Sequence, residues 1–231
     1  MSRYVLIMLS SSIFLLTSCA KEFQSWNLPE LNLVPESCGT ISDIDGNSYA
    51  TIRIGTQCWM QSNLKVSKYR DGYNIPNITD NNQWNLTNTG AWCNYNNAPG
   101  NGTTYGKLYN WYAVNDSRGL CPTGWHVPSD EEWSTLEIYL GPSAGGKLKS
   151  TTGWYSSNIG ATNSSGFTAM PGGARDASGG FSIVGEYGFW WSSSDAGSGS
   201  AWSRTLYFYG AGVDSYNFGS RYGFSVRCVR D

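Results

Sequence analysis

The chain has few charged side chains and only one histidine among its 231 residues. Lys and Arg number 15, Asp and Glu number 17, and charged residues make up 14% of the total. Proteins that bind nucleic acids or other polyanions need a concentrated positive field. A formal net charge of −2 does not supply one, so we expect no nucleic-acid partner.

Motifs of the common enzyme classes are also missing. The sequence has no phosphate-binding loop and no His-Glu-x-x-His pair. His126 stands between Trp125 and Val127 on a predicted strand, where a packed or hydrogen-bonded role is commoner than general-base catalysis. We predict that the protein is not an enzyme and has no catalytic residue, cofactor or Cys/His metal site. A structural calcium ion held by carbonyl and Asp or Asn oxygens stays compatible with the sequence.

Long apolar runs are lacking beyond the first residues. Arg3 precedes the apolar stretch 4–16, which is short for a bilayer span. It ends in Leu16-Thr17-Ser18-Cys19, which resembles the bacterial lipobox. We predict a lipoprotein signal peptide over 1–18, a lipid on Cys19, a tether over 19–37 and a single domain over 38–231. Because Ala20 does not resemble an inner-membrane retention signal, we expect a lipid-anchored, surface-exposed protein of the outer membrane. An ordinary secretory signal is the alternative.

Five cysteines remain after Cys19, and two bridges among them can be drawn in five times three, or fifteen, ways. An oxidising compartment allows such bridges. We prefer Cys38–Cys58, which would tie the N-terminal strand to the third strand. We also prefer Cys121–Cys228, which would tie the strand before the main helix to the last strand. Cys93 would then be left over.

The best-specified element is a helix predicted over 130–140. Pro128 ends the preceding strand, and Ser129 with Glu132 forms a capping box. Gly141 marks the end of the helix. The apolar residues that recur at helical spacing on one face are Trp133, Leu136 and Leu140.

Most of the remaining chain has the composition of short strands joined by tight turns, with 28 glycines and 15% aromatic residues. Asp45-Gly46 predicts a hairpin turn, and we prefer this interpretation to a calcium loop because no bidentate glutamate follows. Residues 71–104 are read as long loops around one or two short strands. The spacing within 107–115 fits a helical face. The fold class expected is α+β, with two helices, near 107–115 and 130–140, packed on twisted antiparallel sheets with long loops.

Several sequence segments resemble motifs of known protein families. Residues 126–133 and 223–230 are similar to stretches of sulfatase-modifying, formylglycine-generating-type proteins. A closer resemblance, to the Fibrobacter succinogenes major paralogous domain of bacterial surface lipoproteins, covers most of 38–231. It is carried by residues 43–47, 57–64, 105–114, 125–128, 171–173, 190–193 and 223–231.

The resemblance implies a C-type-lectin-like fold but no particular activity. Formylglycine generation needs two nearby cysteines, and no two cysteines of this chain are closer than Cys19 and Cys38. The calcium-and-sugar motifs of true C-type lectins, Glu-Pro-Asn or Gln-Pro-Asp followed by Trp-Asn-Asp, are missing too. We therefore expect the C-type-lectin-like fold, but neither formylglycine generation nor calcium-dependent sugar binding.

The C-terminal strands carry an aromatic surface that we predict to be the ligand-binding site. Placing Leu206 and Phe208 in the core sends Tyr207 and Tyr209 outward, because successive strand residues face opposite sides. Tyr and Trp offer large contact area with a polar tip, and Arg204 would add a stacking cation. Within this surface, we expect the side chains of Trp191 and Trp202 to be at least half buried in the core. The predicted ligand-binding residues are Trp191, Trp202, Arg204, Tyr207, Tyr209, Tyr216, Asn217 and Tyr222, with Arg221 beside them.

These observations favour a surface-anchored binding or adhesion module that recognises a glycan or a protein. The first alternative is a structural component of the cell envelope, or of a surface assembly, without a soluble ligand. The second alternative is an enzyme of the formylglycine-generating type. A ligand pocket with exposed tyrosine rings would distinguish the binding module from the structural component.

Overall fold

The computed structural model describes residues 35–231. The predicted leader over 1–18, the predicted lipid site Cys19 and most of the tether over 19–37 lie outside this range. No helix within it is long and apolar enough to cross a membrane. In chain order, the elements are β1 (Ser37–Ser42), β2 (Ser48–Ile54), β3 (Gln57–Met60), α1 (Asn81–Leu86), β4 (Trp92–Cys93), η1 (Tyr95–Asn97), α2 (Pro99–Tyr105), β5 (Leu108–Tyr109), α3 (Trp111–Val114), β6 (Trp125–His126), α4 (Asp130–Leu140), α5 (Ala144–Leu148), β7 (Ala174–Arg175), β8 (Phe181–Ser182), β9 (Tyr187–Gly197), β10 (Ser200–Tyr207), β11 (Asp214–Gly219) and β12 (Val229–Arg230).

The first and last described strands belong to one antiparallel sheet, whose order is β1-β2-β3-β12-β6. Disulfides join Cys38 to Cys58 and Cys121 to Cys228, with Cα separations of 6.2 Å and 6.0 Å. Both predicted pairs are confirmed, and Cys93 is free and buried among the described cysteines. The bridges tie β1 to β3, and the segment before β6 to the segment before β12.

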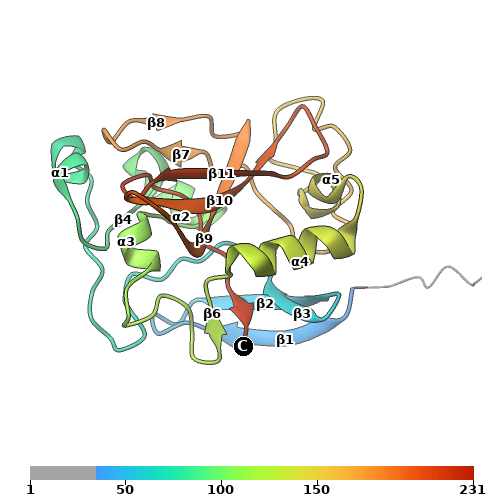
Figure 1. Cartoon of the computed structure of the whole chain (residues 1–231), viewed down its shortest axis with the longest axis horizontal. Coiled ribbons are helices and arrows are strands. Elements are labelled where there is room, and N and C mark those ends of the chain that lie inside the picture. Colours follow the sequence, from blue (N-terminus) through green and yellow to red (C-terminus); the bar gives the residue numbers. More distant parts are fainter. Residues whose placement is uncertain (1–34) are drawn as a thin grey trace, which may run out of the picture. The chain divides into compact units, whose positions relative to one another are not determined.

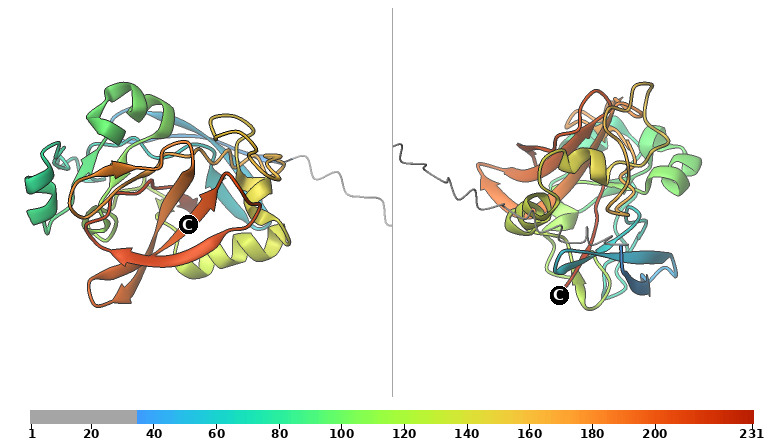
Figure 2. Two further views of the ribbon diagram at one scale, coloured as in Figure 1. Left: turned by 90° about the horizontal axis from the view of Figure 1, so that it is seen from above. Right: turned by 90° about the vertical axis from the view of Figure 1, so that its right-hand side faces the viewer.

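A separate three-stranded antiparallel sheet has the order β11-β10-β9. Helix α4 lies between the two sheets (Figure 1). The right-hand view of Figure 2 also shows the blue strands of the first sheet below the orange strands of the second. The core packed around α4 draws side chains from both sheets. Its largest fully buried members are Trp59, Trp133, Phe167 and Trp190.

Helix α4 begins as its sequence predicts. The Ser129 hydroxyl accepts a hydrogen bond from the Glu132 amide, and the Glu132 carboxylate accepts one from the Ser129 amide, which completes the capping box. Gly141 follows the last turn with a φ of 67°, a conformation that glycine adopts without strain. The predicted bounds 130–140 are confirmed.

The predicted number of helices is wrong, although a mixed α/β domain with few helices and several antiparallel sheets is confirmed. The segment 107–115 forms β5 and then the four-residue helix α3, because Asn110 caps α3 by accepting from the Ala113 amide. Within 71–104, α1 begins where Asp80 accepts from the Gln83 amide. Helix α2 follows in the same segment, so the predicted long loops around one or two short strands do not account for its two helices.

Three buried cations hold the irregular segments together. Lys149, Arg175 and Arg227 are each fully buried, and each donates to backbone carbonyl oxygens. Burial lowers the pKa of Arg227 to about 9, and its guanidinium bonds Met60 O at 2.9 Å and Asn63 Oδ1 at 2.8 Å. Carbonyls that no sheet or helix satisfies thereby find donors, which buried backbone groups require.

Candidate functional site

The two faces of the three-stranded sheet have different neighbours. Leu206 is 2% exposed and packs in the core that includes α4. Tyr207 lies on the other face, opposite Tyr187 of β9. The register predicted from Leu206 and Tyr207 is therefore correct. Phe208, which follows the end of β10, is partly buried against the α4 core, and Tyr209 is 51% exposed.

Arg204 does not belong to the aromatic surface, and its predicted role as an exposed stacking cation is wrong. It is two residues from Leu206, so it shares the face that packs on α4. Its side chain is 3% exposed and pairs with Asp130 and Glu137 of that helix. Its Nη2 also donates to Asp130 O at 3.0 Å and to Ser134 Oγ at 3.1 Å. Arg204 thus attaches the sheet to the helix and offers no donor to a ligand.

Trp191 is likewise misassigned as a ligand-binding residue, because it is fully buried. Its indole Nε1 donates to Tyr109 O at 2.8 Å, and its ring lies 4.5 Å from that of Phe224. Trp202 and Asn217 pair across β10 and β11 on the same face of the sheet as Arg204. They therefore lie on the opposite face from the tyrosines, with Trp202 half-buried and Asn217 exposed.

Four tyrosines gather on the face that points away from α4, and we call Tyr187, Tyr207, Tyr209 and Tyr216 the tyrosine surface. The rings of Tyr207 and Tyr209 stack at 4.6 Å, and the hydroxyls of Tyr187 and Tyr209 are 2.8 Å apart. Tyr209 and Tyr216 are each 51% exposed. Half-buried aromatic residues flank the surface, with Phe218 lying 6.4 Å from Tyr216 by ring centroid.

The remaining predicted residues lie at the margin of the tyrosine surface. Tyr222 is half-buried, and its ring is 5.2 Å from Phe218. Arg221 is exposed and donates from Nε to Thr87 O at 3.2 Å. Of the eight predicted ligand-binding residues, the structure brings Tyr207, Tyr209 and Tyr216 together, with Tyr222 beside them.

Tyr187 is missing from the predicted ligand-binding residues, although it is the first residue of β9. The signal was present: Tyr187, Phe189 and Trp191 alternate with Gly188 and Trp190, as strand residues do. The pKa of Tyr187 is raised to about 12, first by its hydrogen bond with Tyr209 and then by burial. The Tyr187 hydroxyl therefore stays protonated at physiological pH, and a tyrosine hydroxyl can both donate and accept a hydrogen bond.

The chain beneath Tyr207 and Tyr209 is firmly supported. The Lys149 ammonium donates to Tyr207 O at 3.0 Å, Gly210 O at 2.8 Å and Ile159 O at 3.0 Å. Helix α5 also approaches this turn closely, because a Cβ at Gly145 would lie 1.9 Å from Gly212 O. The turn is thus held from below by a buried cation and a tightly packed helix. Preorganisation of this kind lowers the entropic cost of binding.

The His126 ring and the Cys93 thiol are both engaged within the fold. Burial lowers the pKa of His126, but hydrogen bonds from Nδ1 to Asp231 (2.6 Å) and from Nε2 to Glu132 (2.8 Å) outweigh it and raise the pKa. Both ring nitrogens are engaged by carboxylates, so neither is free to accept a proton from a substrate. Burial raises the pKa of the Cys93 thiol to about 11, which makes it a packed core group. Residues 35–231 contain no group of three or more His, Cys, Asp or Glu side chains that could hold a metal ion.

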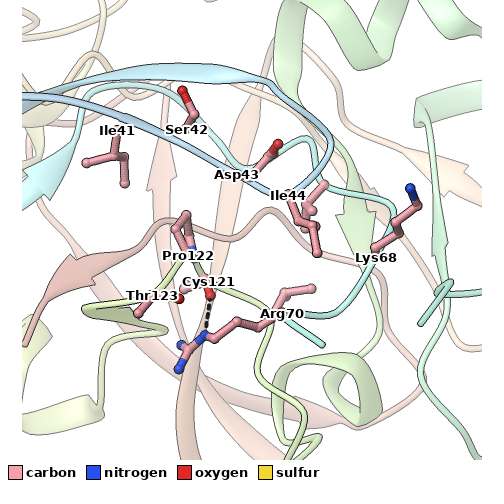
Figure 3. A pocket seen from close by; sticks show the side chains of 11 residues that line it. Ile41, Ser42, Asp43, Ile44, Lys68, Arg70, Cys121, Pro122 and Thr123 are labelled. Carbon is pink, nitrogen blue, oxygen red and sulfur yellow. Dashed lines mark hydrogen bonds between the residues drawn. The ribbon is translucent and has the colours of Figure 1, made fainter. Parts of the chain in front are cut away.

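A hollow of about 330 Å³ lies between the β1–β2 hairpin and the segment 120–123 (Figure 3). Its charged lining groups are engaged by the protein. The Asp43 carboxylate accepts from the Asn47 amide and the Tyr49 hydroxyl within its own hairpin, as the turn interpretation predicts. Arg70 donates from Nε to Cys121 O and from Nη2 to Trp125 O. None of its lining residues belongs to the three-stranded sheet, so the hollow is separate from the tyrosine surface.

The described residues define a disulfide-linked, mixed α/β domain that presents tyrosines on one face of a small sheet. The family model of the Fibrobacter succinogenes major domain matches residues 52–230. The chain belongs to this family, as its motifs predicted. Comparisons with curated proteins and with solved structures returned no match.

Proposed function

We propose that this protein is a lipid-anchored, surface-exposed binding or adhesion module of the outer membrane that recognises its ligand through the tyrosine surface. The ligand class is a glycan or a protein. We propose binding, rather than catalysis, as the role of the domain. We also propose that the domain has a C-type-lectin-like fold. The pairing of the first and last strands in one sheet, and the separate small sheet that carries the tyrosines, support this comparison.

The observation that carries the proposal is the grouping of half-exposed tyrosines on a rigid support. Tyr209 and Tyr216 each expose 51% of their surface while their neighbours stack behind them. A clustered aromatic surface is commoner at recognition sites than on surfaces without a partner. Tyr rings stack on sugar faces and also anchor protein interfaces, so both ligand classes fit.

The test is a glycan-array and pull-down screen with the purified protein, repeated with a Tyr209→Ser/Tyr216→Ser variant. The matched control is Tyr139→Ser on α4, because Tyr139 is 49% exposed and lies outside the three-stranded sheet. We leave Tyr207 unchanged, because its ring packs on Gly210 and its loss would disturb the turn.

We expect a genuine ligand to bind wild type and the Tyr139 variant alike, and to lose about tenfold or more in affinity for the double variant. Equal affinity for all three proteins would show that the tyrosine surface is not the site. Melting temperatures measured in parallel would show whether each variant is folded.

A further inference from the structure

We propose that the tyrosine surface selects a cationic polypeptide segment, in which an Arg or Lys side chain lies against the tyrosine rings beside Asp214. This inference rests on the proposed function and names the ligand class of the same surface.

The charged groups at the tyrosine surface are carboxylates. Asp214 begins β11 opposite Thr205, so it lies on the same face as Tyr207 and Tyr216. The Tyr216 hydroxyl donates to Asp214 Oδ2 at 3.2 Å, and a carboxylate has further lone pairs to offer. Glu186 stands directly before Tyr187 and is half-buried.

The nearby cations are occupied elsewhere, and exposed Arg221 at the margin of the surface donates from Nε to Thr87 O. Arg204 lies on the other face of the sheet, buried against Asp130 and Glu137. Lys149 is buried beneath the turn, and its ammonium group donates hydrogen bonds to three carbonyl oxygens. Neither cation neutralises Asp214 by a direct contact. A positive group on the ligand would therefore meet an acceptor that no lysine or arginine of this sheet already fills.

The tyrosines themselves indicate a negative local field. Burial and the Asp214 carboxylate raise the pKa of Tyr207, and the charge of Asp214 raises the pKa of Tyr216. The charge of Glu186 also raises the pKa of Tyr187, although less than the hydrogen bond between Tyr187 and Tyr209 and less than burial. A potential that resists phenolate formation also attracts cations and repels anions.

Aromatic faces add to this preference. The negative face of a tyrosine ring attracts a guanidinium or ammonium group, and guanidinium also stacks flat on it. Tyr209 and Tyr216 present half of their surface to the ligand. Acidic glycans and phosphorylated segments would face like charge at Asp214 and Glu186, so we expect them to be rejected.

The experiment titrates the purified protein with an acetylated, amidated peptide of alternating Gly and Arg, and with its Gly–Glu counterpart. Ring signals of isotope-labelled tyrosine, observed by NMR, report binding. We expect the Gly–Arg peptide to shift Tyr209 and Tyr216 but not Tyr139, and the Gly–Glu peptide to shift none of them. Raising the salt concentration should weaken the interaction.

Three variants locate the charge. Asp214→Asn should weaken Gly–Arg binding by about threefold or more, and Asp214→Glu should retain it. The control Asp195→Asn removes an exposed carboxylate near the β9–β10 turn and should bind as wild type does. Unshifted Tyr209 and Tyr216 signals with the Gly–Arg peptide, or wild-type affinity in Asp214→Asn, would overturn the inference.

The two proposals fail in different ways. A neutral glycan that binds wild type and Asp214→Asn equally, but not Tyr209→Ser/Tyr216→Ser, would overturn the cationic ligand class and leave the proposed function standing. A partner that binds the double tyrosine variant as well as wild type would remove the surface from both proposals.

Discussion

Replacing Lys149 with Met tests the support beneath the tyrosine surface. Met keeps the length of the side chain and removes its charge and its three donors. The carbonyl oxygens of Ile159, Tyr207 and Gly210, which the ammonium contacts at 2.8–3.0 Å, would lose this partner. We expect the folded protein to remain but to lose stability, first at the turn that carries Tyr209.

The magnitude follows from two opposing terms. A buried carbonyl left without a donor costs about 1–3 kcal/mol, and three of them are affected. Removing the buried ammonium also removes its own desolvation cost, which is several kcal/mol for an ion. We therefore expect a net loss of about 3 kcal/mol. At about 2–4 °C per kcal/mol for a domain of this size, the melting temperature should fall by roughly 6–12 °C.

Calorimetry and amide hydrogen exchange measure the two parts of this prediction. Exchange should accelerate at Ile159, whose amide donates to Phe208 O at 2.7 Å, and at Gly146, whose amide donates to Ala211 O at 3.1 Å. The matched control is Lys147→Met in α5, two residues before Lys149, because half-exposed Lys147 contacts one carbonyl, Leu140 O. If Lys149→Met were no less stable than Lys147→Met, the three-carbonyl contact would not be supporting the turn.

Three further predictions concern the helix cap, its histidine neighbour and the N-terminus. Ser129→Ala should cost ~1 kcal/mol and lower the melting temperature by roughly 2–4 °C, and an unchanged transition would show that the cap does not stabilise α4. Folding raises the pKa of His126 from 6.5, because its hydrogen bonds to Asp231 and Glu132 outweigh the opposing effect of burial. Its contribution to stability is therefore fully present below pH 6.5 and is lost as the pH rises through the folded-state pKa. Urea unfolding should show that the stability advantage of wild type over His126→Gln shrinks as the pH rises through that window, and a constant difference would contradict the linkage. Cys19→Ala should release the protein from membranes or block its processing, whereas unchanged membrane attachment in a fractionation assay would refute lipidation at Cys19.

Local rules predicted the parts of the fold that depend on neighbouring residues. The capping box needs only Ser129 and Glu132, three positions apart, so its geometry could be read from the sequence. Strand alternation likewise placed Leu206 inward and Tyr207 outward. Alternation also assigns Arg204 to the Leu206 face, so its exposed role could have been rejected before the structure was known.

Distant partners account for what could not be predicted. Asp130 and Glu137 contact Arg204 across 74 and 67 residues of chain, and their positions in the helix do not indicate that partner. The buried cations Lys149, Arg175 and Arg227 bind carbonyl oxygens, which carry no side-chain signature in a sequence. The contact between Tyr187 and Tyr209 likewise depends on how β9 pairs with β10, which the spacing of residues within one strand does not indicate.

The most direct test of the tyrosine surface is a hydroxyl-radical footprint of the protein saturated with the partner recovered by the screen. Each tyrosine reports its own solvent exposure, and Tyr73 and Tyr139 serve as internal references because they are 67% and 49% exposed. We predict that oxidation of Tyr209 and Tyr216 falls on binding while Tyr73 and Tyr139 react as before. Protection of the reference tyrosines, with Tyr209 and Tyr216 still fully reactive, would contradict the proposed site.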